Sequence, residues 1–309
     1  MMKRRAVWAG VLTVVALLSG CTSTGPTPGR SSQPSGPGPA VIASFNFPES
    51  SLLAEIYAQS MEHAGIPVRR EFDLGPREIV RPALQRGLVD VVPEYLGSAL
   101  TSADPAAVVE RRPAAALLAD LQRVAAQWHL TVLQPSAAQD QNGFAVLAGT
   151  ANRLQLRTLS DLAPVAPQFV LGGAPECPTR ELCYPGLRRV YGINFRRFVA
   201  FDDAGQRLTA LEQGVIDVEV TSTTDPRLAS GSIVMLRDDK GLQPVESVVP
   251  ILADRVVREY GATLTHALDA VSANLDSSAL TFLNWRVADG KDPRSEAHDW
   301  LQRHGLLGN

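Results

Sequence analysis

Two copies of one helix–glycine–strand unit constrain the fold of this chain of 309 residues most strongly. Residues 82–92 have the sequence PALQRGLVDVV and residues 209–219 have TALEQGVIDVE, with Ala, Leu, Gly, Asp and Val at equivalent positions. In each unit the pattern predicts a helix that ends at the glycine and is followed at once by a strand. The repeat predicts two lobes built on equivalent sheets. The alternative is a chance match, because a helix, a glycine and a strand often occur in this order.

The repeat also indicates where a ligand would bind. Tyr95 and Ser222 lie five residues beyond the shared aspartates, Asp90 and Asp217, just past the carboxyl ends of the two predicted strands. Ligands of open α/β sheets bind at that edge. If the two lobes face each other, Tyr95 and Ser222 belong to opposite walls of one cleft.

The rest of the chain alternates between strand and helix patterns, which predicts an α/β fold with mostly parallel sheets. The predicted strands are residues 41–45, 68–74, 89–92, 130–133, 144–148, 169–172, 216–220 and 233–236. The predicted helices are residues 50–64, 76–86, 106–127 with a break near Pro113, 186–191, 205–213, and the chain beyond Pro250 to its end; residues 159–162 are a further element of unassigned type. With 45% hydrophobic residues, each lobe has enough apolar side chains to bury a core.

The N-terminus has the layout of a bacterial lipoprotein signal. Residues 1–5 are positively charged, and the apolar run that follows, residues 6–18, is too short to span about 30 Å of hydrocarbon comfortably. It leads to Leu-Ser-Gly-Cys at residues 18–21, which resembles the lipobox, so residues 1–20 are the predicted signal peptide and Cys21 the lipidated residue. Residues 21–40 are rich in Pro, Gly and Ser and predict a flexible tether. An ordinary secretory signal and an uncleaved membrane anchor are the alternatives.

Charge and cysteine content exclude several functions. Loss of the three basic residues of the signal takes the formal net charge from −3 to −6, and no basic stripe is present, so nucleic acid is not an expected partner. Cys177 and Cys183 are then the only cysteine pair in an oxidising compartment, which favours a disulfide over free thiols or a metal site. The histidines lack metal-ligand spacing and no Gly-x-Ser-x-Gly motif is present, so we expect no metal, no cofactor and no catalytic residue.

A series of short motifs runs in unbroken order from about Val41 to the C-terminus: SFNFPES at 44–50, LAEIYA at 53–58, LGPRE at 74–78, DVVPEYLG at 90–97, GLRRVYG at 186–192, TTD at 223–225, LRDDK at 236–240 and the tail at 293–306. These motifs closely resemble those of the osmoprotectant (glycine betaine, choline and carnitine) binding lipoproteins of ABC importers. The resemblance implies a type II periplasmic-binding-protein fold, with two α/β lobes joined by two crossings and a ligand cleft between them.

The resemblance also implies the domain boundaries and the partners. Lobe 1 is expected to comprise residues 41–143 and 237–309, and lobe 2 residues 144–236. The protein is expected to be an extracytoplasmic receptor, lipid-anchored to the outer face of the cell membrane. It would bind a quaternary amine or related compatible solute by closure of the lobes and deliver it to an ABC permease with its ATPase, without chemistry of its own.

The expected aromatic cage of this family is incomplete here. A quaternary ammonium group cannot donate hydrogen bonds, so aromatic faces hold it best, each contributing about 0.5–2 kcal/mol. Related proteins use four tyrosines, and the matching positions of this chain are Tyr95, Phe144, Ser222 and Val245. Tyr184 or Phe47 could supply a missing face. Otherwise the pocket would favour a more polar or differently shaped solute, with Ser222 and Thr223 donating hydrogen bonds.

The carboxylate of a betaine needs an arginine or hydroxyl donors. Arg180, inside the expected disulfide loop, is the predicted partner, with a solvated surface role as the alternative. Ser98 is a further hydroxyl candidate, and Glu49, Ser50 and Asn142 are placed near the cleft, where capping or hinge roles are the alternatives. The competing function is a lipoprotein that has kept the fold but acts as a sensor or interaction module for another small polar or aromatic ligand.

Overall fold

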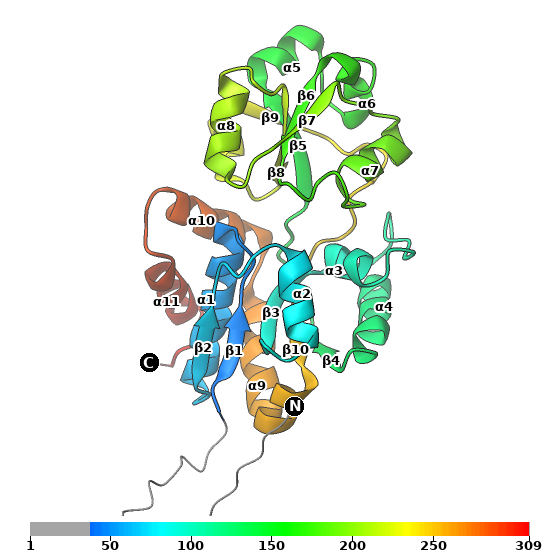
Figure 1. Ribbon diagram of the computed structural model, residues 1–309. Helices are drawn as coiled ribbons and strands as arrows, with labels where there is room; N and C mark the ends of the chain where they lie inside the picture. Colours follow the sequence, from blue (N-terminus) through cyan, green and yellow to red (C-terminus); the bar gives the residue numbers. More distant parts are fainter. Residues whose placement is uncertain (1–37, 309) are drawn as a thin grey trace, which may run out of the picture. The chain divides into compact units, whose positions relative to one another are not determined.

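The computed structural model describes residues 38–308, which form two α/β lobes, each built around a five-stranded sheet (Figure 1). The predicted signal peptide and Cys21 lie outside the described residues, as does all but the end of the predicted tether. Within residues 38–308 no helix combines the length and the apolar run that a membrane span requires.

Lobe 1 contains the sheet β2-β1-β3-β10-β4. Strand β1 pairs in parallel with β2 and β3, whereas β10 is antiparallel to both β3 and β4. The strands are β1 (Ala40–Ala43), β2 (Val68–Glu71), β3 (Val91–Tyr95), β4 (Leu130–Val132) and β10 (Val248–Ala253). The helices are α1 (Pro48–His63), α2 (Arg77–Gln85), α3 (Leu96–Ala103), α4 (Ala114–Ala126), α9 (Asp254–Asn274), α10 (Ser277–Ala288) and α11 (Pro293–Arg303).

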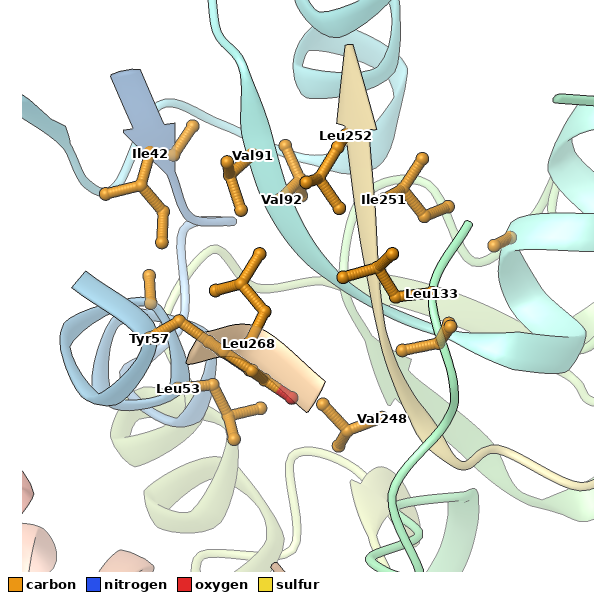
Figure 2. Close-up of a cluster of buried hydrophobic side chains, with 14 of the residues drawn as sticks. Ile42, Leu53, Tyr57, Val91, Val92, Leu133, Val248, Ile251, Leu252 and Leu268 are labelled. Carbon is orange, nitrogen blue, oxygen red and sulfur yellow. The ribbon is translucent and has the colours of Figure 1, made fainter. Parts of the chain in front are cut away.

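The core of lobe 1 forms where α1 and α9 cover the sheet. Figure 2 shows Tyr57 of α1 and Leu268 of α9 among apolar side chains of β1, β3 and β10. Tyr57 is fully buried, and its hydroxyl group meets the Ser272 hydroxyl at 3.0 Å, so its one polar atom is satisfied inside the core. This packing fixes the N-terminal end of α1 beside the sheet edge.

Lobe 2 contains the sheet β7-β6-β8-β5-β9, again with both parallel and antiparallel pairs. Its strands are β5 (Asn142–Leu147), β6 (Val170–Gly173), β7 (Arg197–Ala200), β8 (Val218–Ser222) and β9 (Ile233–Leu236). Its helical segments are α5 (Ala148–Leu154), α6 (Leu159–Leu162), η1 (Ala166–Gln168), α7 (Tyr184–Gly186), η2 (Leu187–Tyr191), α8 (Ala204–Glu212) and η3 (Pro226–Ser230). Cys177 and Cys183 form a disulfide bond.

The sequence repeat occupies the same place in both lobes. Residues 82–92 run from α2 into β3, and residues 209–219 run from α8 into β8, each the central strand of its sheet. The Asp90 carboxylate accepts a hydrogen bond from Val41 N at the start of β1, and the Asp217 carboxylate accepts one from Val170 N at the start of β6. The shared aspartate therefore fastens each central strand to its parallel neighbour, and the prediction of two equivalent sheets is confirmed.

Several predictions about the elements were wrong. The sheets are mixed rather than mostly parallel: β10, which we expected to be helical beyond Pro250, is an antiparallel strand of the first sheet, and β5 runs antiparallel to β8 and β9 in the second. Pro250 is tolerated there because it faces Pro93 and its own carbonyl points away from β3, to Leu133 N, so no N–H between β3 and β10 is lost. The helix expected over residues 106–127 begins only at Ala114, after Pro113 at the N-cap, and α3 was missed.

Gly97 makes the tightest approach between α3 and the segment that leads into β10. A Cβ atom at Gly97 would lie 2.2 Å from Pro244 Cγ and 3.2 Å from the Val245 carbonyl oxygen. We predict that Gly97→Ala lowers the free energy of unfolding by about 1–3 kcal/mol, because a ring and a backbone atom would have to move. Gly149→Ala in α5, where a Cβ would meet nothing within 4 Å, is the control. Equal stability of the two variants in urea unfolding would contradict this packing.

Candidate functional site

Two aromatic rings lie together at the carboxyl end of β3. Tyr95 is the last residue of that strand, and Phe47 immediately precedes α1. Their ring centroids are 6.2 Å apart, and Phe47 remains 36% exposed whereas Tyr95 is buried. We call these two rings the aromatic wall. The Ser50 hydroxyl accepts a hydrogen bond from Phe45 N, which holds the loop that carries Phe47 against the first turn of α1.

Glu49 lies beside the aromatic wall, in the first turn of α1. Proline at the first helical position and an acidic residue in the first turn favour a helix start at this point. The carboxylate is 93% buried and accepts hydrogen bonds from the Tyr95 hydroxyl at 2.5 Å, from the Thr224 hydroxyl at 2.6 Å and from the Asn284 side-chain amide. Burial and the neighbouring Glu49 carboxylate raise the pKa of Tyr95 well above its usual value, so the phenol stays a donor.

Thr224 reaches Glu49 from lobe 2. It follows Ser222, the last residue of β8, in a turn that Arg227 stabilises by binding the Asp225 carboxylate. The Ser222 hydroxyl lies 3.1 Å from the Thr224 hydroxyl. The hydrogen bond from Thr224 to Glu49 therefore joins the strand ends of the two lobes, the edges where the repeat placed Tyr95 and Ser222.

Asp140, between β4 and β5, brings a second carboxylate to the same turn. It accepts hydrogen bonds from Thr224 N at 3.1 Å and from the Thr223 hydroxyl at 3.2 Å. Burial, and then the charge of Glu49, raise the pKa of Asp140 well above its usual value. Among residues 38–308 neither Glu49 nor Asp140 forms an ion pair, so two acidic groups share this place with neutral donors alone.

Ser98 is engaged by another buried acid. Its hydroxyl donates to Glu246 at 2.6 Å and its backbone N–H donates to the same carboxylate at 3.0 Å. Burial raises the pKa of Glu246 to about 7. Ser98 therefore connects α3 to the segment that precedes β10, and its hydroxyl is occupied by this contact.

Four other predicted site residues have structural contacts. Phe144 is 1% exposed and lies in the core of lobe 2, which removes it from the rings open to a ligand. The Tyr184 hydroxyl accepts a hydrogen bond from Phe195 N, and its ring packs on the Phe195 ring. Val245 packs against the core of lobe 1 and binds Gly97 N through its carbonyl. Asn142 begins β5 opposite Ser222.

Arg180 is occupied by an acidic residue of the other lobe. Its guanidinium group donates to both carboxylate oxygens of Glu78, at 3.0 and 2.8 Å. Leu182, from the same disulfide loop, is buried in the apolar cluster of lobe 1. In this arrangement the loop contacts lobe 1, and Nε and one terminal nitrogen of Arg180 are held by Glu78.

The sequence reasoning missed Asp140, Thr224 and Asn284. Thr224 is next to Thr223 in the TTD motif at residues 223–225, and Asp140 lies two residues before Asn142, so both were close to positions already considered. No sequence pattern marked Asn284 as a site residue, because only the packing of α10 brings it to Glu49. The described residues contain no group of three or more side chains arranged to hold a metal ion.

The comparisons with known proteins agree with this architecture. Residues 38–303 match the family model described as the substrate binding domain of ABC-type glycine betaine transport system. The glycine betaine-binding protein YehZ of Escherichia coli is 25% identical, with 97% of each chain covered. A crystal structure described as a glycine betaine/carnitine/choline ABC transporter matches 87% of this chain and 99% of its own length, with a TM-score of 0.68 and 23% identity. The expected periplasmic-binding-protein fold is thereby confirmed.

A further relative is a longer protein. The ergothioneine transport permease/ergothioneine binding protein EgtU of Helicobacter pylori is 25% identical over 87% of this chain, which spans about half of that protein's length.

The pKa of Glu246 gives a pH-dependent stability. Its value of about 7 in the folded state lies above the ordinary 4.5, so folding favours the protonated form, and this contribution is lost as pH rises from 4.5 through 7. A glutamine at position 246 does not ionise, so Glu246→Gln does not lose stability in this way as pH rises. We predict that the free energy of unfolding of Glu246→Gln, relative to that of the parent protein, increases by up to roughly 3 kcal/mol between about pH 4 and pH 8.

Urea unfolding at the two pH values measures this difference. Glu71→Gln on the edge strand β2 is a matched loss of one charge at an exposed place. A difference between Glu246→Gln and the parent protein that does not change with pH would show that folding does not raise the pKa of Glu246.

Proposed function

We propose that this chain, which belongs to the family of substrate-binding domains of ABC-type glycine betaine transport systems, binds its quaternary amine against Phe47 and Tyr95. It is the extracytoplasmic receptor of an importer for such amines, a transport protein and not an enzyme. The observation that carries the proposed site is the half-exposed ring of Phe47 beside Tyr95, at the strand edge where Glu49 is buried.

Phe47 and Glu49 compensate for the incomplete cage. A trimethylammonium group is attracted to ring faces at about 0.5–2 kcal/mol each, and two rings alone leave the site weaker than four. A buried carboxylate next to those rings attracts the same cation, and burial of Glu49 weakens the screening of that attraction by water. On the side of lobe 2, the hydroxyl groups of Thr223 and Ser222 would bind the polar end of the ligand by giving up their contacts with Asp140 and Thr224.

Closure of the lobes is the proposed mechanism. Contacts between the lobes include the polar pairs Thr224 with Glu49, Arg180 with Glu78, and Arg189 with Glu110, together with the apolar side chain of Leu182 on lobe 1. Exposed ion pairs contribute little, about 0–1 kcal/mol each, so they do not hold the lobes together by themselves. A ligand that touches Phe47 on one lobe and Thr223 on the other would add the binding free energy that favours the closed state over the open one.

The delivery of the ligand requires a permease and the membrane. We propose that an ABC permease with its ATPase recognises the closed receptor, and that Cys21 carries the lipid that anchors it to the outer face of the cell membrane. Residues 1–20 would be removed as the signal peptide, and residues 21–40 would tether lobe 1 (41–143 and 237–309) and lobe 2 (144–236) to the lipid.

The first test is calorimetric titration of residues 21–309 carrying Cys21→Ser, with glycine betaine, choline and carnitine. We predict binding of at least one of these amines. Phe47→Ala and Tyr95→Ala should each weaken it by roughly 2- to 30-fold, because each removes one aromatic face. Phe282→Ala removes an exposed ring on α10, away from Phe47 and Tyr95 in the sequence, and is the control. Binding that is unaffected by both aromatic variants would contradict the proposed site, and absence of binding would contradict the proposed function.

The second test concerns the anchor. We predict that mass spectrometry of the mature protein finds an N-terminal Cys21 with diacylglycerol attached, and that Cys21→Ser abolishes the modification. A mature N-terminus at another residue, or an unmodified Cys21, would show that the protein is released or held in another way.

A further inference from the structure

Glu49 and Asp140 form a pair of acidic groups around one threonine. Thr224 donates its hydroxyl to Glu49 at 2.6 Å and its backbone N–H to Asp140 at 3.1 Å, so the two carboxylates lie on either side of this residue. Their other partners are the hydroxyl of Tyr95, the hydroxyl of Thr223 and the amide of Asn284. All of these donors are neutral.

The charged groups packed around this pair are already committed. On α2, Arg77 pairs with Glu94 of β3 at 2.9 Å. On η3, Arg227 pairs with Asp225 and with Glu219 of β8. The segment before β10 adds the further acid Glu246, whose backbone carbonyl binds Asp140 N, and α10 contributes only the neutral Asn284. Within residues 38–308 no cation is therefore paired with either member of the pair.

Buried carboxylates without a counter-charge are unfavourable, and they are stabilised by a cation that enters the site. We propose that Glu49 and Asp140 make this receptor select a small organic cation that has no carboxylate over a zwitterionic betaine. This inference rests on the proposed binding site and names the substrate class within it.

The reason lies in the charge of the two kinds of amine. In glycine betaine one methylene group separates the ammonium from the carboxylate, so an ammonium group placed at the aromatic wall brings the carboxylate close to Glu49 and Asp140. Like charges brought together in a buried site are disfavoured. Arg180, the expected carboxylate partner, is bound to Glu78. Choline carries a hydroxyl in place of the carboxylate and lacks this repulsion.

The experiment compares choline with glycine betaine on residues 21–309 carrying Cys21→Ser, by calorimetric titration at one pH near neutrality. We expect choline to bind the parent protein about tenfold or more tightly than glycine betaine. Glu49→Gln and Asp140→Asn keep the size of each side chain and remove the acidic group that can carry a negative charge beside a bound cation. Each should reduce the preference for choline about tenfold, chiefly by weakening choline binding.

Matched controls keep the outcomes distinct. Glu71→Gln removes one negative charge from the exposed edge strand β2 and should leave the preference unchanged. Thermal unfolding checks that each variant folds. If Glu49→Gln does not fold, Asp140→Asn, which lies outside any helix or strand, still tests the inference. Equal or tighter binding of glycine betaine by the parent protein, or an unchanged preference in the folded variants, would overturn the inference while leaving the proposed site intact. If the parent protein binds neither amine, the proposed function itself fails.

Discussion

The hydrogen bonds to the buried Glu49 carboxylate organise the site and join the lobes. Tyr95 comes from the end of the central strand β3, Thr224 from the turn after β8, and Asn284 from α10. A buried carboxylate must be satisfied by donors, so these distant segments are held in one geometry. The same carboxylate lies next to the aromatic wall, so the group that organises the site also sets its charge.

The scaffold explains why these groups meet. The equivalent order of strands in the two sheets places the ends of β3 and β8 at corresponding edges, and Asp90 and Asp217 fasten both central strands in the same way. The chain needs little else to bring Tyr95 and the turn after Ser222 to one place. Function in this family resides in the side chains at these edges, while the sheets provide position.

Much of the fold followed from the sequence because it depends on local signals. The repeat predicted two sheets, and Tyr95 was found at the end of its strand because strand ends are local features. Strand β10 could not be predicted, since its proline is acceptable only opposite Pro93, a contact between residues far apart in the chain. Burial of Phe144 and pairing of Arg180 with Glu78 are likewise decided by tertiary packing, which spacing alone does not reveal. Asp140 and Asn284 gained their roles only when folding brought them to Thr224 and Glu49.

The central claim is that a quaternary ammonium group lies against Phe47 and Tyr95, next to the carboxylate of Glu49. A crystal structure with choline bound tests it most directly. The account predicts the choline nitrogen within about 6 Å of both ring centroids, with its hydroxyl directed to the turn that carries Thr223. Choline bound elsewhere, with Phe47 still free in solvent, would contradict it.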